Sequence, residues 1–99
     1  MATQIRVFTI KPEKMKEWIT AWTRRLAPLR LKWGFSIPGA WVLEEANQFF
    51  WLLRNDGPEG FEARDAAYYA SEDGRSLDPD PAQYIAIQET RFVTAVWPP

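Results

Sequence analysis

The sequence predicts an α+β fold whose strands and helices follow one another in the order β-α-β-β-α-β. Runs of β-branched and aromatic residues indicate four strands, and two segments with apolar residues three and four positions apart indicate helices. The length of 99 residues fits one domain, which we expect to span residues 1–99. This order is that of the ferredoxin-like arrangement, in which two helices cover one face of a four-stranded antiparallel sheet.

The predicted elements follow one another closely along the chain. The strands are Gln4–Ile10, Phe35–Glu44, Gln48–Arg54 and Gln88–Trp97, the helices are Met15–Trp33 and Phe61–Ala70, a short helix begins at Asp80-Pro81, and a polar loop covers Ser71–Asp78. Pro38 predicts that the strand containing it lies at a sheet edge. Pro28 lies within the long helix, where it removes one backbone hydrogen bond and crowds the carbonyl of Arg24. We therefore expect the long helix to kink between these two residues.

The two strands expected at the centre of the sheet are apolar on both sides. One contains the unbroken run Phe49-Phe50-Trp51-Leu52-Leu53, and Gln4–Ile10 carries apolar residues on either face. A sheet with one face in water should instead alternate apolar with polar residues. Because the helices cover only one face, we expect a second copy of the chain to cover the other, which predicts a homodimer.

The composition excludes several classes of function. The chain has no cysteine and no histidine, which excludes thiolate catalysis, disulfides, zinc knuckles, histidine-dependent triads and histidine-ligated haem. Twelve basic and thirteen acidic residues form no basic stripe, so we expect no nucleic-acid partner. The sequence shows neither a secretory leader nor the roughly 20 apolar residues of a membrane span. We expect a cytoplasmic protein that uses no metal, no cofactor and no membrane.

Three stretches together carry a family resemblance over Ile5–Val96. They are the opening strand Arg6-Val7-Phe8-Thr9-Ile10-Lys11-Pro12, the helix exit Leu26-Ala27-Pro28-Leu29-Arg30 followed by Lys32, Gly34 and Phe35, and the third strand ending in Leu53-Arg54. In this order and spacing they resemble the NIPSNAP family. The resemblance implies a dimeric α/β barrel, in which two ferredoxin-like sheets pack face to face. The wider superfamily contains cofactor-independent monooxygenases, haem-degrading enzymes, dehydratases, cyclases and proteins without an assigned activity, so the fold leaves the function open.

The chain also departs from the family resemblance. Members often carry a histidine where Trp51 stands, a tyrosine where Asn55 stands and a tyrosine in place of Phe8. If those polar groups serve catalysis in relatives, this chain lacks them. The arginine pair Arg6 and Arg54 remains.

Strand arginines and aromatic residues are the candidate site residues. Arg6 lies among apolar neighbours, where it could bind a carboxylate or oxyanion, or form a salt bridge with a strand carboxylate such as Glu89. Glu89 and Arg91 share a face of the last strand, as an acid/base and anion pair or as a surface ion pair. The tryptophans could line a ligand pocket or serve as core or dimer contacts. The weak catalytic candidates are Glu89 and Tyr84, and the candidate ligand contacts are Arg6, Phe8, Trp41, Trp51, Arg54 and Arg91.

Four cations near the end of the long helix, Arg24, Arg25, Arg30 and Lys32, complement the helix dipole, and we expect them on a solvated face.

Two functions remain open, and the sequence leaves undecided whether the protein is an enzyme. In the first, which we favour, the protein binds a small aromatic or acidic apolar ligand in a pocket between the sheet and its helices, with an arginine orienting one acidic group. In the second, it is a cofactor-independent monooxygenase, cyclase or isomerase, whose substrate supplies the reactive carbanion. A carboxylate or tyrosine with a displaced pKa inside the pocket would favour the enzyme. The residues to examine are Glu89, Tyr68, Tyr69 and Tyr84. A pocket filled by side chains would instead favour a structural dimerisation module.

Overall fold

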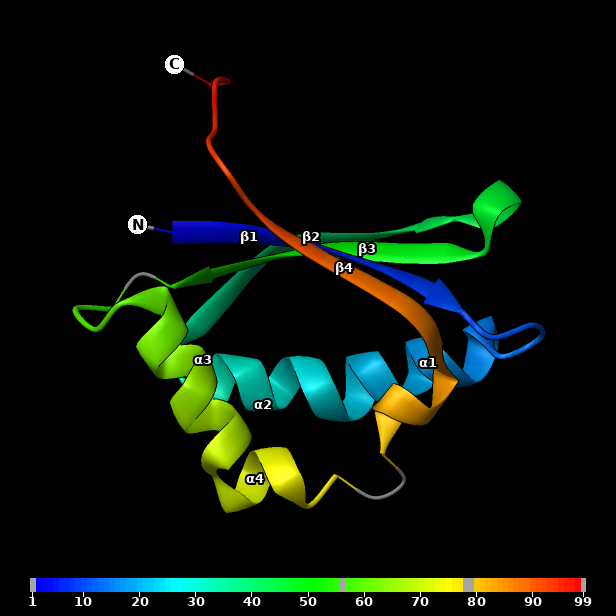
Figure 1. Ribbon diagram of the computed structural model, residues 1–99, viewed down its shortest axis with the longest axis horizontal. Coiled ribbons are helices and arrows are strands. Elements are labelled where there is room, and N and C mark those ends of the chain that lie inside the picture. Colours follow the sequence, from blue (N-terminus) through cyan, green and yellow to red (C-terminus); the bar gives the residue numbers. More distant parts are fainter. Residues whose placement is uncertain (1, 56, 78–79, 99) are drawn as a thin grey trace.

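The structure, a computed structural model, describes residues 2–55, 57–77 and 80–98. Its antiparallel sheet has the strand order β2-β3-β1-β4, and its helices lie against one face of that sheet (Figure 1). The strands are β1 (Ala2–Ile10), β2 (Phe35–Leu43), β3 (Gln48–Asn55) and β4 (Ile85–Val93). The helices are α1 (Met15–Ala21), the π-helical η1 (Trp22–Leu26), α2 (Ala27–Lys32), the 3₁₀ turn η2 (Glu44–Ala46), α3 (Phe61–Ala70), α4 (Glu72–Arg75) and the 3₁₀ turn η3 (Pro81–Tyr84). The predicted α+β, ferredoxin-like fold is confirmed.

The last strand differs from its prediction. β4 occupies Ile85–Val93 rather than Gln88–Trp97. It pairs with β1 from Ile10 opposite Ile85 to Thr3 opposite Val93, and β1 begins at Ala2. A strand requires a neighbour for its backbone hydrogen bonds. Because the two strands are antiparallel, β4 ends beside the first residues of β1.

The segment predicted as a polar loop after α3 contains the short helix α4. Its N-cap is Ser71, whose Oγ accepts a hydrogen bond from the backbone N–H of Gly74 at 3.0 Å. Asp78, the last residue of the predicted loop, lies outside the described residues.

The long helix accommodates Pro28 through a π-helical turn. The turn η1 lies where the sequence predicts a kink, and in it the backbone N–H of Ala27 donates to the carbonyl of Trp22, five positions earlier. Pro28 then falls in the first turn of α2, directly after the π-helical turn.

The π-helical turn also determines which side chains face the sheet. Trp18, Trp22, Leu26 and Arg30 follow one another four positions apart, and a regular α-helix would carry each of them about 40° further round its axis. The wider turn of η1 offsets part of this rotation. As a result Arg30 is on the inner side of the helix and only 1% exposed.

The core lies between the sheet and the helices and consists mainly of aromatic side chains. Edge-to-face contacts join Phe8 to Trp18 and Trp51, with ring centroids 5.4 and 6.2 Å apart, and Trp22 to Trp51 at 5.5 Å. The buried apolar residues are Phe8, Ile10, Trp18, Trp22, Phe35, Phe49, Trp51, Leu53, Phe61 and Tyr68. No helix in the described part of the chain is long and apolar enough to cross a membrane.

The opposite face of the sheet carries no helix in the described part of the chain (Figure 1). The register places Val7 opposite Phe50 and Glu89, so these side chains share the face turned away from the helices. Trp41, also opposite Phe50, stacks on that ring with centroids 5.2 Å apart and remains 47% exposed. The centre of the free face therefore carries apolar side chains, as the sequence predicts.

Candidate functional site

A cavity of about 410 Å³ lies between the inner face of the sheet and the helices. Its sheet side comes from β1, β3 and β4, and its helix side comes from α1, η1, α2, α3, α4 and η3, together with Leu77 and Asp80 between the last two. One end is polar, with the side chains of Gln4, Arg6, Arg30, Asp65, Tyr68 and Tyr69, and the rest is mainly apolar, with Phe8, Trp18, Leu26, Leu77, Pro81 and Ile85. The volume of this cavity lies within the range of known small-molecule sites, and its two ends differ in polarity.

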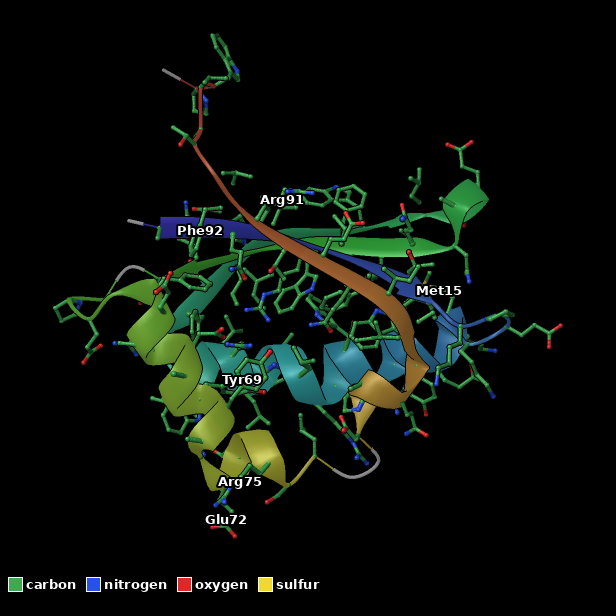
Figure 2. The ribbon with its side chains drawn as sticks, viewed as in Figure 1. Met15, Tyr69, Glu72, Arg75, Arg91 and Phe92 are labelled. Carbon is green, nitrogen blue, oxygen red and sulfur yellow. The ribbon has the colours of Figure 1, made fainter. Side chains whose placement is uncertain are left out.

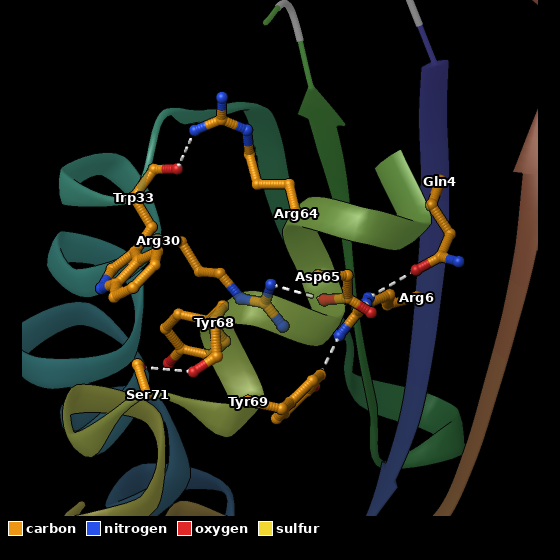
Figure 3. A network of polar contacts seen from close by, with 9 residues as sticks. All are labelled: Gln4, Arg6, Arg30, Trp33, Arg64, Asp65, Tyr68, Tyr69 and Ser71. Carbon is orange, nitrogen blue, oxygen red and sulfur yellow. Dashed lines mark hydrogen bonds and ion pairs between the residues drawn. The ribbon is translucent and has the colours of Figure 1, made fainter. Parts of the chain in front are cut away.

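Two arginines share one carboxylate at the polar end of the cavity (Figure 3). Nη1 of Arg30 lies 2.6 Å from Oδ1 of Asp65, and Nη2 of Arg6 lies 3.3 Å from Oδ1 and 3.2 Å from Oδ2 of the same group. Arg6 also donates from Nε to Gln4 at 2.7 Å and from Nη1 to the hydroxyl of Tyr69 at 3.0 Å. The cluster thus joins β1, α2 and α3 through one acidic residue.

Both guanidinium groups are held in the protein interior. Arg6 is 5% exposed and Arg30 is 1% exposed. A buried cation is costly unless it is paired, and in the described part of the chain the only carboxylate that contacts either group is Asp65. Asp80 also lines the cavity, but it is exposed and its Oδ1 accepts the backbone N–H of Ala82. The polar end therefore has more positive charge than its contacting carboxylate neutralises.

Aromatic rings hold the two guanidinium groups in place. The central carbon of the Arg30 guanidinium lies 4.0 Å from the ring centre of Tyr68 and 4.9 Å from those of Tyr69 and Phe35. The corresponding carbon of Arg6 lies 5.6 Å from the Trp51 ring. A guanidinium gains from an aromatic face, most of all where water is excluded.

The position of Asp65 on α3 depends on the neighbouring residue Arg64. Nη1 of Arg64 donates to the backbone carbonyl of Trp33 at 2.6 Å, and its Nη2 pairs with Glu59. The side chain passes directly over Gly34, where an added Cβ would clash with it. Arg64 thereby fixes α3 to the end of α2 and places Asp65 between the arginines.

Burial raises the pKa of the Tyr68 hydroxyl above its ordinary value, although the charge of Arg30 acts in the opposite direction. At neutral pH this hydroxyl is therefore protonated and can donate a hydrogen bond. It has no hydrogen-bond partner among the described residues.

Comparison with known proteins identifies the family. The family model described as NIPSNAP matches residues 3–98, which is nearly the whole chain. The chain belongs to the NIPSNAP family. No curated protein matches this NIPSNAP chain.

Solved structures agree with the NIPSNAP fold. An uncharacterized NIPSNAP domain protein from Burkholderia xenovorans has a TM-score of 0.83 and 19% identity, covering 100% of this chain and 99% of that one. A NIPSNAP family protein from Agrobacterium tumefaciens has a TM-score of 0.83 and 13% identity, covering 97% and 93%. A putative antibiotic biosynthesis monooxygenase from Nitrosomonas europaea has a TM-score of 0.72 and 13% identity, covering 98% and 91%. At these identities the likeness shows the fold alone.

The NIPSNAP structure divides the candidate ligand contacts between the two faces of the sheet. Arg6, Phe8 and Trp51 line the cavity. Trp41, Arg54 and Arg91 are not among the described residues of its wall; the register places them on the free face, and Figure 2 shows Arg91 on the side of the sheet away from the helices.

The two weak catalytic candidates are also absent from the described part of the cavity wall. Glu89 is on the free face, opposite Val7, and Tyr84 borders an open groove beside α1. Arg6 is salt-bridged to Asp65 rather than to Glu89. Glu89 lies opposite Val7 on the free face, and Arg6, the residue before Val7, points to the other face of the sheet.

One sequence expectation about the helix-end cations is wrong. Arg30, expected on a solvated face with Arg24, Arg25 and Lys32, is buried and lines the cavity. The regular 3.6-residue period hides this, because η1 shifts the inner side of the helix.

Sequence reasoning missed Asp65 as a site residue. Its place in the first half of α3 gives no sign that a buried arginine lies opposite. A charged residue one helical turn before Tyr68 and Tyr69 is the one local signal that could have suggested it.

Proposed function

We propose that this NIPSNAP protein binds a small ligand with an apolar, aromatic body and one acidic group in the cavity between the sheet and the helices. The observation that carries the proposal is the pair of buried arginines, Arg6 and Arg30, held at the polar end by the single carboxylate of Asp65. An acidic group entering there would meet a fixed cation in surroundings that exclude water, where charge-assisted hydrogen bonds are strong.

The remaining cavity wall supports an aromatic ligand body. Phe8, Trp18 and Trp51 present ring surfaces from two strands and the long helix, and Leu26 and Ile85 add aliphatic surface. Covering apolar ligand surface here would contribute about 25 cal/mol for each Å² removed from water. The acidic group would then fix the orientation of the ligand.

The alternative, a cofactor-independent monooxygenase, cyclase or isomerase, has less support from the cavity. The donor-rich wall of the cavity would favour an enolate-like substrate. Abstraction of a proton from such a substrate, however, requires a base of suitable pKa. The pKa of Tyr68 is displaced upwards, away from that of a base active at neutral pH, and the Asp65 carboxylate is occupied by two arginines. Ligand binding is therefore the better-supported function.

We also propose that the protein is a homodimer joined through the free face of the sheet. Exposed apolar side chains there include Trp41, Leu43, Ile87 and Val93. Segment 94–98, which contains the exposed Val96 and Trp97, extends from β4 on the same side of the sheet (Figure 1). A second copy would cover surface that a monomer leaves in water.

Titration calorimetry with 2-naphthoate and its uncharged amide tests the binding proposal. We expect the acid to bind at least about 10-fold more tightly than the amide, because only the acid forms charge-assisted hydrogen bonds with the arginines. Thr90→Phe, which places a ring in the cavity from β4, should weaken binding of the acid, whereas the same change at the exposed Thr94 should not. Equal binding of acid and amide, or equal binding by both variants, would contradict the proposal. Native mass spectrometry of freshly purified protein would add the mass of any ligand retained from the cell.

A further inference from the structure

The hydrogen-bond partners of the buried Arg6 guanidinium differ in charge (Figure 3). Its Nη2 contacts the Asp65 carboxylate, whereas its Nε donates to Oε1 of Gln4 at 2.7 Å and its Nη1 donates to the hydroxyl of Tyr69 at 3.0 Å. An amide oxygen and a hydroxyl accept hydrogen bonds but carry no net charge. These two partners therefore satisfy donors of the guanidinium without neutralising it.

Gln4 is the neutral partner whose place a carboxylate could take without a change of shape. Gln4 and Arg6 are two positions apart on β1, so both side chains lie on the inner face of the sheet, where both line the cavity. An arginine can only donate hydrogen bonds, so the Gln4 atom that meets it is the carbonyl oxygen. The amide nitrogen of Gln4 donates to no group in the described part of the chain. A glutamate here would keep the acceptor and remove no hydrogen bond within that part.

The amide at position 4 decides the charge balance of the polar end. Arg6 and Arg30 contribute two positive charges there, and Asp65 is the one carboxylate that contacts them in the described part of the chain. One positive charge is left over. A carboxylate at position 4 would neutralise it, and the effect would be large because charges interact strongly where water is excluded.

We infer that Gln4 is a specificity-determining residue: by pairing Arg6 through a neutral oxygen it preserves the surplus positive charge, so that the cavity selects a monoanionic ligand over an uncharged ligand of the same shape. This inference rests on the proposed function and names the residue that sets the charge of the ligand at that site. Gln4 acts through Arg6 and needs no contact with the ligand. A purely structural role would be served as well by glutamate, because a carboxylate forms the stronger hydrogen bond with a guanidinium.

The test changes the charge at position 4 and measures the charge preference of the cavity. 2-Naphthoate and its uncharged amide are titrated by calorimetry into the unaltered protein, Gln4→Glu and Gln88→Glu. Gln88 is the matched control: it also lines the cavity, but it is exposed and is not a partner of Arg6 among the described residues. We expect the preference for the acid, at least about 10-fold in the unaltered protein, to fall to within about 2-fold in Gln4→Glu, with binding of the amide unchanged. Gln88→Glu should retain a preference of at least about 5-fold, because water screens an exposed charge.

The possible failures are distinct. If the unaltered protein prefers the acid and Gln4→Glu keeps that preference, or Gln88→Glu loses it to the same extent, the inference about Gln4 is overturned and the proposed function stands. If the unaltered protein binds neither probe, or binds both equally, the proposed function and this inference both fall. Urea unfolding without ligand gives a further check, since we expect Gln4→Glu to unfold at the same or a higher urea concentration than the unaltered protein. A lower midpoint would show that the amide of Gln4 is required for the fold and would overturn the inference.

Discussion

Arg6 and Asp65 are 59 positions apart in the sequence, yet Nη2 of Arg6 lies 3.2 Å from Oδ2 of Asp65. Because Arg30 contacts the same carboxylate, three elements of the fold depend on one acidic side chain. This dependence has direct consequences for stability.

Replacing Asp65 with asparagine should destabilise the protein strongly. Asp65→Asn keeps the shape of the side chain but leaves two buried guanidinium groups without their carboxylate, so we expect a loss of about 3 to 5 kcal/mol in the free energy of unfolding. The control is Asp73→Asn, which removes an exposed ion pair with Lys32 and should cost far less, because exposed ion pairs contribute little to stability. Urea unfolding measures both variants. Equal losses would show that the buried pairing contributes nothing beyond a surface ion pair.

The raised pKa of Tyr68 predicts a loss of stability at alkaline pH. In the unfolded chain this hydroxyl ionises near its ordinary pKa of 10.0, whereas burial keeps it protonated to higher pH in the folded protein. The contribution that the protonated Tyr68 hydroxyl makes to the free energy of unfolding is therefore complete below pH 10. It is lost as the pH rises from there through the pKa of the folded state, because the unfolded state releases its proton first. Tyr68→Phe should remove this contribution. Urea midpoints for both proteins at intervals from pH 8 to 11 are the measurement, and parallel curves throughout would contradict the prediction.

Gly34 should tolerate alanine poorly. Its φ of +88° is one that residues with a Cβ rarely adopt, and the added Cβ would displace Arg64 from the Trp33 carbonyl. We expect Gly34→Ala to lower the free energy of unfolding by about 1 to 3 kcal/mol. Gly60→Ala is the control, since a Cβ there meets no neighbour, and it should cost under about 1 kcal/mol as a weaker N-cap. Chemical unfolding that ranks Gly60→Ala as the more damaging change would refute this account of Arg64.

The free face of the sheet should determine the oligomeric state. Trp41→Glu places a charge on this face and should convert a dimer, expected to bury at least roughly 1,200 Å² in total, into monomers. Leu31→Glu, at a similarly exposed position on α2, should leave the dimer intact. Light scattering at micromolar concentration reports the mass of each protein. A monomeric unaltered protein, or a Trp41→Glu variant that stays dimeric, would count against the proposed interface.

The local sequence pattern determined most of the fold. The run from Phe49 to Leu53 identified a central strand, Pro38 an edge strand, and the apolar spacing from Met15 onward the long helix. These signals depend on residues a few positions apart, so they can be read without knowing what lies across the sheet. The apolar character of both faces of the central strands was visible in the same way.

Only the tertiary structure decided which charged and polar side chains meet in the cavity. Arg30 faces inward because the π-helical turn before Pro28 changes the rotation of the helix, and no regular period contains that change. Asp65 reaches both arginines because α3 is fixed against the end of α2 by Arg64. Such contacts depend on how separate elements are placed and rotated against one another, to within the few ångströms of a hydrogen bond. Local spacing carries no information at that precision, which is why the sequence identified Arg6 as a candidate but not the carboxylate that holds it.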